Sequence, residues 1–150
     1  MPKTIAFVRR PGSSFSQAIS ANPKDQPIDL KRACLQHEHY IAALEKTGVE
    51  IVSLPAIHGY PDAPFVEDTT VVFDHLALAC PNKEKSRRGE GASIHKEIKK
   101  YRAIKTLPPS VTLDGGDVLN TDEKIFVGIS ERTNMEAVNA LAKFTKKPVF

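Results

Sequence analysis

The chain has 150 residues, of which 41% are hydrophobic and 26% charged, and its formal net charge is +3 from 21 basic and 18 acidic residues. This length and composition are typical of one globular domain with its own core. The near balance of basic and acidic residues argues against a nucleic-acid-binding protein. No apolar run approaches the roughly 20 residues of a membrane span, and the N-terminus resembles no secretory signal, so we expect a cytoplasmic protein.

The first third of the chain predicts a strand, a long loop, a helix and a second strand. The apolar run 5–8 predicts the first strand, and the Ser-, Gly- and Pro-rich segment 9–27 predicts the loop. Asp29 is a suitable N-cap and Gly48 a suitable C-terminal stop for the helix. Residues at steps of three and four give this helix one apolar face: Leu30, Ala33, Cys34, His37, Ile41 and Leu44. Segment 49–54 predicts the next strand.

The middle of the chain predicts a hairpin followed by a helix. Segments 66–73 and 76–80 read as strands joined by Asp74-His75, a two-residue hairpin connection. Most of 86–105 reads as a helix, with Ile94, Ile98 and Tyr101 on its apolar side. Its basic residues recur at helical spacing and predict a solvated face rather than a binding patch: Lys96, Lys99, Lys100, Arg102 and Lys105.

The last third predicts the same order of elements again. Segments 111–119 and 124–129 read as a strand pair, 133–144 as a helix, and 148–150 as the start of a further strand. We therefore predict one α/β domain over 1–150 built from repeat units of roughly 1–60, 61–110 and 111–150, the last incomplete. One such unit cannot bury its own sheet face, so neighbouring units must close around it.

Carboxylates occur at matching points of two of these units. Two carboxylates flank a predicted turn of two glycines in Asp114-Gly115-Gly116-Asp117. The matching point of the preceding unit, where we expect a strand, holds Glu67-Asp68. One interpretation is a tight turn with solvated carboxylates. The other is a pocket for a planar cation such as guanidinium, which pairs with carboxylates through two parallel hydrogen bonds.

Arginines lie at the head of both predicted helices of these units. Arg87, Arg88 and Arg132 would oppose the helix dipole there, so helix stability alone is a poor explanation for them. A guanidinium fork suits a substrate carboxylate, whereas the alternative is a salt bridge to an Asp of the neighbouring repeat.

The cysteines and histidines predict neither a disulfide framework nor a metal site. Cys34 lies on the apolar helix face and reads as a core residue, and Cys80 ends a strand with no clear activating group nearby. His37 and His39 lie about 200° apart around a helix and cannot share a metal. We expect neither a metal nor a cofactor.

Several of these strings together resemble one known family. FVEDTTVV, SRR before a helix, LDGGDVL and FVGISERTN are similar to the dimethylarginine dimethylaminohydrolases of the guanidino-group-modifying (amidinotransferase) superfamily, as are the N-terminal FVRRP and the helix DLKRACLQHEHYIAALEKTG. The resemblance covers essentially the whole chain. It implies a five-bladed α/β propeller (pentein) of pseudo-repeated ββαβ units, of which this chain would form half to three-fifths.

The resemblance also implies roles for individual residues. Asp62, Glu67 and Asp68 would bind the guanidinium and amino groups of the substrate, while Arg87 and Arg132 would hold its α-carboxylate. Asp117 would lie in the region that supports the catalytic histidine, and the loop 9–27 would be a substrate lid.

The family's reaction is covalent hydrolysis of a linear amidine. A cysteine thiolate attacks the guanidinium carbon, an alkylamine leaves, and water releases citrulline, with a histidine as general acid and base. The family's histidine and cysteine have no matching positions in this chain. We therefore expect a substrate-binding half that is inactive alone and acts on arginine or a methylated arginine together with a C-terminal segment.

Other functions stay open at this point. The chain could belong to an arginine deiminase or an amidinotransferase, or it could be a non-catalytic module that binds guanidino ligands or forms homo-oligomers through the open edge at 148–150. A further alternative makes Cys80 a substitute nucleophile. We expect a small guanidino ligand as partner, and no nucleic acid or membrane.

Overall fold

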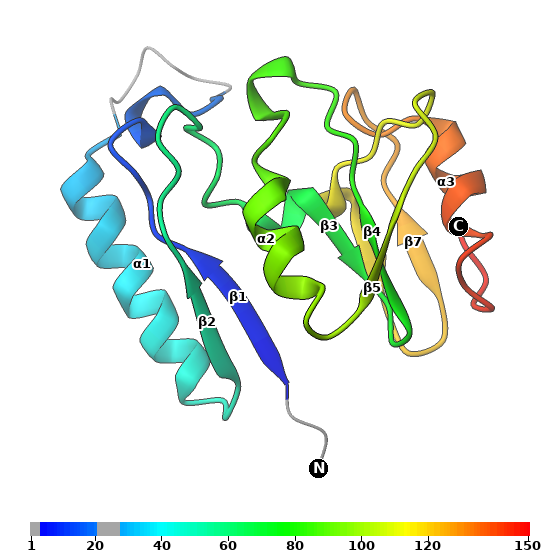
Figure 1. The fold of residues 1–150 in the computed structure, drawn as a ribbon, viewed down its shortest axis with the longest axis horizontal. Helices are drawn as coiled ribbons and strands as arrows, with labels where there is room; N and C mark the ends of the chain where they lie inside the picture. Colours follow the sequence, from blue (N-terminus) through cyan, green and yellow to red (C-terminus); the bar gives the residue numbers. More distant parts are fainter. Residues whose placement is uncertain (1–3, 21–27) are drawn as a thin grey trace. The chain divides into compact units, whose positions relative to one another are not determined.

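The computed structural model describes residues 4–20 and 28–150 and divides into two compact units, residues 1–66 and 67–150. In unit 1, β1 (Ile5–Arg9) and β2 (Glu50–Leu54) form a parallel pair in register from Ile5–Glu50 to Arg9–Leu54. Helix α1 (Leu30–Glu45) connects them and lies alongside both strands (Figure 1). This is the predicted strand, helix, strand order.

Local signals set both ends of α1. The Asp29 carboxylate accepts a hydrogen bond from Arg32 N at 3.1 Å, and Gly48 adopts φ 83° after the helix. The predicted loop after β1 contains a short 3-10 turn, η1 (Phe15–Gln17), whereas its segment 21–27 lies outside the described residues.

The predicted apolar face of α1 is confirmed, but it is only half-buried. Its six residues are partly buried, every other α1 residue is exposed, and none is fully buried. The prediction that Cys34 is a core residue is therefore wrong: it is half-buried, and its thiol donates to the Pro11 carbonyl at 3.8 Å. The physical reason is that two strands form the sheet beside α1 in the described part of unit 1, so part of the helix face stays uncovered.

Unit 2 begins with a three-stranded sheet. Strand β3 (Thr70–Val72) pairs antiparallel with β4 (Leu76–Ala79), and β5 (Ala103–Thr106) pairs parallel with the other edge of β4. The hairpin at Asp74-His75 is confirmed, since Phe73 N donates to Leu76 O at 2.8 Å. The first half of the predicted strand 66–73 is instead a 3-10 turn, η2 (Val66–Thr69).

The helix predicted over 86–105 is wrong at both ends. A 3-10 turn, η3 (Lys85–Arg87), precedes it, Gly89 adopts φ 111°, and α2 spans only Gly91–Ile98. Ile94 and Ile98 are buried as expected, but Tyr101 is 44% exposed because it follows the helix. Strand β5 was missed because Ala-Ile-Lys-Thr has little apolar pattern and joins the sheet through its backbone.

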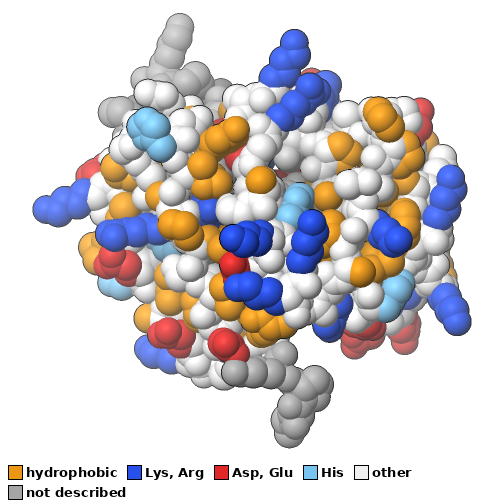
Figure 2. All heavy atoms as spheres, viewed as in Figure 1, with side chains coloured by type: hydrophobic (Ala, Val, Ile, Leu, Met, Phe, Trp, Pro, Cys, Tyr) orange, Lys and Arg blue, Asp and Glu red, His pale blue; other side chains and the backbone are white. Residues whose placement is uncertain are grey.

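The basic residues of this region are solvated, although not all on a helix. All five are exposed, and Lys105 lies on β5. Figure 2 shows Lys and Arg side chains spread over the viewed face among hydrophobic and uncharged ones. Among the described residues, no helix has the length and apolar character needed to cross a membrane.

The last part of unit 2 repeats the order of its first part. A 3-10 turn, η4 (Gly115–Asp117), leads into β6 (Val118–Asn120), so most of the predicted strand 111–119 is not a strand. Strand β7 (Ile125–Val127) is antiparallel to β6, helix α3 (Met135–Leu141) follows, and Val149 then forms a parallel bridge to Ile125. Strand, antiparallel strand, helix and parallel partner thus occur twice.

The core of unit 2 lies between its strands and α3. Five of its side chains are fully inaccessible: Leu78, Leu113, Ile125, Ala137 and Leu141. These residues come from β4, β7, α3 and the segment before η4, so the two copies share one core. That shared core positions the turns that precede β3 and β6.

Asn134 ties α3 to the segment before the glycine turn. Its Oδ1 accepts from Ala137 N and Thr112 N, each at 3.2 Å, and its Nδ2 donates to Ser110 O at 2.8 Å. We expect Asn134→Ala to lower the free energy of unfolding by about 1–2 kcal/mol, because it removes a helix cap. Urea unfolding measures this change.

The matched control is Asn139→Ala, at an exposed position of the same helix. We expect that variant to be neutral or slightly stabilising, since alanine is the better helix former. Equal losses in the two variants would contradict the role given to Asn134.

Candidate ligand-binding site

Arg87 lies at the centre of a charged cluster in unit 2. Its Nη1 donates to Asp68 Oδ2 at 2.7 Å, and its Nε and Nη2 both donate to Glu90 Oε2, at 3.0 and 2.9 Å. The Arg87 side chain is only 7% exposed. Burial lowers the pKa of this guanidinium, but its hydrogen bonds to the Glu90 and Asp68 carboxylates raise it overall, so Arg87 is a fixed cation.

Asp114 connects Arg87 to the second arginine. One carboxylate oxygen, Oδ2, lies 3.9 Å from Arg87 Nη1 and forms an ion pair with Arg132, whose Nε is 2.9 Å away. Arg132 also approaches Asp117, with Nη2 3.9 Å from Oδ1. Its side chain is 56% exposed, in contrast to the buried Arg87, so Arg132 can exchange protein partners for a ligand.

Asp117 is held by hydroxyl groups. Its Oδ2 accepts from Ser130 Oγ at 2.8 Å and from Thr133 Oγ1 at 2.7 Å, and Thr133 Oγ1 in turn accepts from Asp114 N at 3.0 Å. Thr133 is fully buried. This network anchors the glycine turn to the segment that carries Arg132.

The glycines bring the turn against η2 more closely than any side chain would allow. A Cβ on Gly115 would lie 2.1 Å from the backbone oxygen of Glu67, and one on Gly116 would lie 2.6 Å from Asp68 Oδ1. The carboxylates of Asp68 and Asp114 are therefore neighbours, although 46 positions separate them in the chain.

This crowding changes the protonation of the carboxyls. Burial, with further contributions from the hydrogen bond and charge of Asp68, raises the pKa of Asp114 to about 7, against the opposing effect of Arg87 and Arg132. Glu67 is exposed as a residue, but desolvation of its carboxyl raises its pKa, and the charge of Asp68 adds to this rise. The site carries more negative charge than its two arginines balance.

Most of the residues singled out in the sequence lie in this cluster: Asp68, Arg87, Asp117 and Arg132, with Glu67 on the same turn as Asp68. Glu67 and Asp68 lie on η2 rather than on the expected strand, because the chain turns there before β3. Glu90 was missed, although its i,i+3 spacing from Arg87 was a usable signal.

Asp62 belongs to unit 1. It is 4% exposed and accepts a hydrogen bond from Ile19 N at 3.0 Å, and the ring of Phe15 lies 6.2 Å from that of Phe65. Both contacts hold the described part of the predicted lid against the segment 60–65. The role of this loop as a lid stays a prediction.

Neither cysteine is arranged as a nucleophile. Cys80 is 8% exposed, burial raises the pKa of its thiol, and its Sγ contacts the Leu78 carbonyl at 3.9 Å. Within residues 4–20 and 28–150, no histidine hydrogen-bonds to either thiol, and no three metal-binding side chains converge. Activation of Cys80 would need a partner that stabilises the thiolate.

Three comparisons bear on this site. Residues 2–146 match the family model described as N,N dimethylarginine dimethylhydrolase, eukaryotic. The dimethylarginine dimethylaminohydrolase of Streptomyces coelicolor is 33% identical over 142 residues, which are 94% of this chain and 55% of that protein. The chain thus spans about half the length of the curated relatives it matches.

Solved structures show the same fold. A Pseudomonas aeruginosa dimethylarginine dimethylaminohydrolase mutant complexed with citrulline is 25% identical, with a TM-score of 0.90 over 100% of this chain and 61% of that one. The N-terminal domain of a cyanobacterial arginine dihydrolase, bound to product, has a TM-score of 0.88 at 15% identity over 99% of this chain and 57% of that one. The predicted α/β class is confirmed, and the fold is that of the pentein proteins.

Gly115→Ala tests the close approach of the two turns. A Cβ at this position meets backbone rather than a movable side chain, so we expect a loss of about 3 kcal/mol in the free energy of unfolding. The control is Gly128→Ala, whose Cβ would meet its nearest atom at an ordinary 3.7 Å. Chemical denaturation of both variants is the measurement, and a Gly115→Ala protein as stable as the control would contradict the contact.

The raised pKa of Asp114 predicts a pH-dependent stability. Its folded-state pKa of about 7 exceeds the usual 3.8, so stability falls as the pH rises between these values. Asp114→Asn cannot ionise. We therefore expect the difference in unfolding free energy between the variant and the wild type to rise by up to about 1.4 kcal/mol per pH unit in this window. Above this window the difference should stay constant.

Urea unfolding at pH 5, 6, 7 and 8 measures that slope. Asp122→Asn, at an exposed position, is the control and should show a constant difference from wild type. A flat difference for Asp114→Asn as well would overturn the assigned shift.

Proposed function

Because the chain belongs to the dimethylarginine dimethylaminohydrolase family, we propose that it forms the substrate-recognition part of a hydrolase acting on the guanidinium carbon of N-methylated arginine. The products would be citrulline and an alkylamine. We also propose that the fold is part of a five-bladed α/β propeller with repeat units near 1–60, 61–110 and 111–150. The recurrence of the β3–β4–α2–β5 order in β6, β7 and α3 supports this.

The observation that carries the proposal is the excess of carboxylates over cations in the cluster of unit 2. In the described part of the chain, Asp68, Glu90, Asp114 and Asp117 pair with Arg87 and Arg132, so four acids meet two arginines. A bound cation would offset the excess negative charge, and it would favour ionisation of Asp114, whose pKa is raised chiefly by burial and further by its neighbour Asp68. A planar guanidinium adds two parallel donors to that charge.

The two arginines differ in what they can offer a ligand. Every nitrogen of Arg87 already donates to Asp68 or Glu90, so as it stands Arg87 orients the carboxylates. Arg132 is exposed and can turn its fork toward a substrate α-carboxylate. We therefore assign Glu67 and Asp68 to the guanidinium and Arg132 to the carboxylate, and Asp117 to anchoring Arg132.

Two further residues carry roles from the resemblance alone. Asp62 is proposed as a ligand for the same substrate, and Arg87 as a second ligand for its carboxylate. Either role is tested by a conservative variant, Asp62→Asn or Arg87→Lys, through ligand affinity measured beside unfolding free energy. A loss of stability without any change in affinity in the folded protein would assign Arg87 to structure alone.

A second candidate function is ligand binding without turnover by this chain. The buried Cys80 thiol, to which no described histidine hydrogen-bonds, favours it. Citrulline formation from asymmetric dimethylarginine and from arginine, measured with the chain alone, distinguishes the two activities. We expect none, and turnover that is lost in Cys80→Ser would reinstate that cysteine as a nucleophile.

Binding itself is tested by calorimetric titration with asymmetric dimethylarginine, arginine and citrulline. We expect the two cationic ligands to bind at least about tenfold more tightly than uncharged citrulline, because charge-assisted pairing contributes roughly 1.5–3 kcal/mol. Gly116→Ala should weaken the cations selectively, since its Cβ displaces the Asp68 carboxylate, whereas Gly128→Ala should not. A folded chain that binds none of the three would refute guanidino recognition by this chain.

A further inference from the structure

Unit 2 also contains a hollow that lies apart from the charged cluster around Arg87, here called the acidic cluster. The acidic cluster lies before the first residues of β3 and β6, and the hollow lies near their last residues. Strands β3 and β6 begin just after Asp68 and Asp117 and end at Val72 and Asn120. At that far end, Asn120 Nδ2 donates to Val72 O at 3.4 Å. The hollow has a volume of about 550 Å³, within the range of small-molecule sites. None of its lining residues belongs to the acidic cluster.

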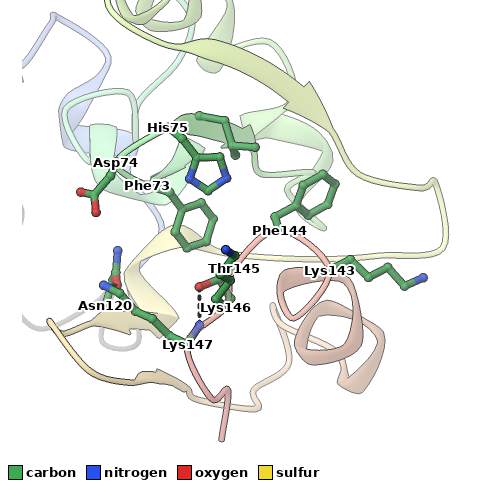
Figure 3. Close-up of a pocket in the computed structure, with 10 residues that line it drawn as sticks. Phe73, Asp74, His75, Asn120, Lys143, Phe144, Thr145, Lys146 and Lys147 are labelled. Atoms are coloured by element: carbon green, nitrogen blue, oxygen red, sulfur yellow. Dashed lines mark hydrogen bonds between the residues drawn. The ribbon is translucent and has the colours of Figure 1, made fainter.

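One side of this hollow is apolar and aromatic. Phe73 and Leu76 belong to the core, at 5% and 9% exposure, and Phe144 packs half-buried against that core. The His75 ring lies 6.3 Å from the Phe73 ring at an interplanar angle of 30°. Figure 3 shows the rings of Phe73, His75 and Phe144 gathered on this side. The surface suits a flat ring of a ligand.

The other side of the hollow is cationic. Lys147 Nζ donates to Asn120 Oδ1 at 3.0 Å and to Thr121 O at 2.6 Å, so the ammonium is held in place and keeps one N–H for a ligand. Lys147 N donates to Thr145 Oγ1 at 3.0 Å, a bond drawn as a dashed line in Figure 3. This preorganisation lowers the entropy lost when a ligand binds.

The charges around the hollow have one prevailing sign. Lys146 and Lys143 also line it, although Lys143 extends away from the rings in Figure 3, and Asp74 is the one acid among the lining residues. A lysine ammonium is a compact charge suited to phosphate or sulfonate groups. The acidic cluster, in contrast, repels such groups, so the two ends of β3 and β6 select ligands of opposite charge.

We propose that this hollow is a binding site for a small anion that carries a planar ring, of the class of the nucleoside phosphates. The ring lies against Phe73, His75 and Phe144, and the anionic group takes the remaining donor of Lys147 together with Lys146. This site is independent of guanidino recognition.

The test is calorimetric titration of the full chain with AMP, with adenosine and inorganic phosphate as the separate halves of that ligand. We expect AMP to bind with a Kd below about 1 mM and each half to bind at least about tenfold more weakly. Phosphate binding as tight as AMP would reduce the site to a simple anion site and overturn the ring contact. No heat from a folded chain at about 5 mM AMP would overturn the proposal entirely.

Two variants of opposite effect locate the site. Lys147→Gln should weaken AMP by about three- to fivefold and Asp74→Asn should strengthen it by a similar factor, as expected for partly exposed charges. Lys99→Gln, an exposed residue outside the hollow, is the control and should change nothing. The gain in AMP affinity expected for Asp74→Asn does not depend on whether Lys147→Gln folds. If both variants bound AMP as tightly as the wild type, AMP would bind elsewhere.

Discussion

The candidate site depends on one interaction, the pairing of the buried Arg87 guanidinium with carboxylates from different parts of the chain. Removing such a charge from water costs several kcal/mol unless good partners satisfy it. Asp68 from η2 and Glu90 at the start of α2 supply those partners, and Asp114 of the glycine turn lies within 4 Å. Arg87 thus fixes three separate segments in one place, and losing it would leave several acids buried together.

This arrangement supplies negative charge in surplus. Two turns, η2 and η4, each deliver acids immediately before a short strand, and the glycines remove the side chains that would otherwise hold the turns apart. Ionisation of Asp114 is costly to the isolated fold, because burial and the neighbouring Asp68 raise its pKa. A stability cost of this kind is a common property of sites that are completed by a ligand.

Much of the fold was accessible from the sequence because its signals are local. The Asp29 cap, the apolar face of α1 and the Asp74-His75 hairpin each follow from neighbouring residues, and each was predicted correctly. Strand β5 was not accessible, because its backbone pairing with β4 leaves little trace in side chains that stay exposed. The half-burial of Cys34 depends on how much sheet covers α1, which no local pattern reports.

The candidate site likewise has features that the sequence predicts and features that depend on the fold. Repetition identified the acids and arginines as a set, but the partner of each charge depends on the fold. Arg87 satisfies Glu90 and Asp68, whereas Arg132 stays exposed, a difference that two similar arginines before two helices do not reveal. The proximity of Asp68 and Asp114 results from a backbone contact at Gly115, for which the sequence offers only the glycine itself.

The contacts at the two ends of β3 and β6 differ in kind, and this difference bears on how the protein can diverge. Near Gly115 the backbones touch with no room for a side chain, so the spacing of the turns there tolerates little variation. At the far end the link is an exposed amide hydrogen bond from Asn120, which many side chains could replace or lengthen. The turns before β3 and β6 are therefore held by a backbone contact beside the acids, whereas the other ends of the strands are joined by a side-chain hydrogen bond. Substitutions at Asn120 can change that far end over evolutionary time while the positions of the acids stay constant.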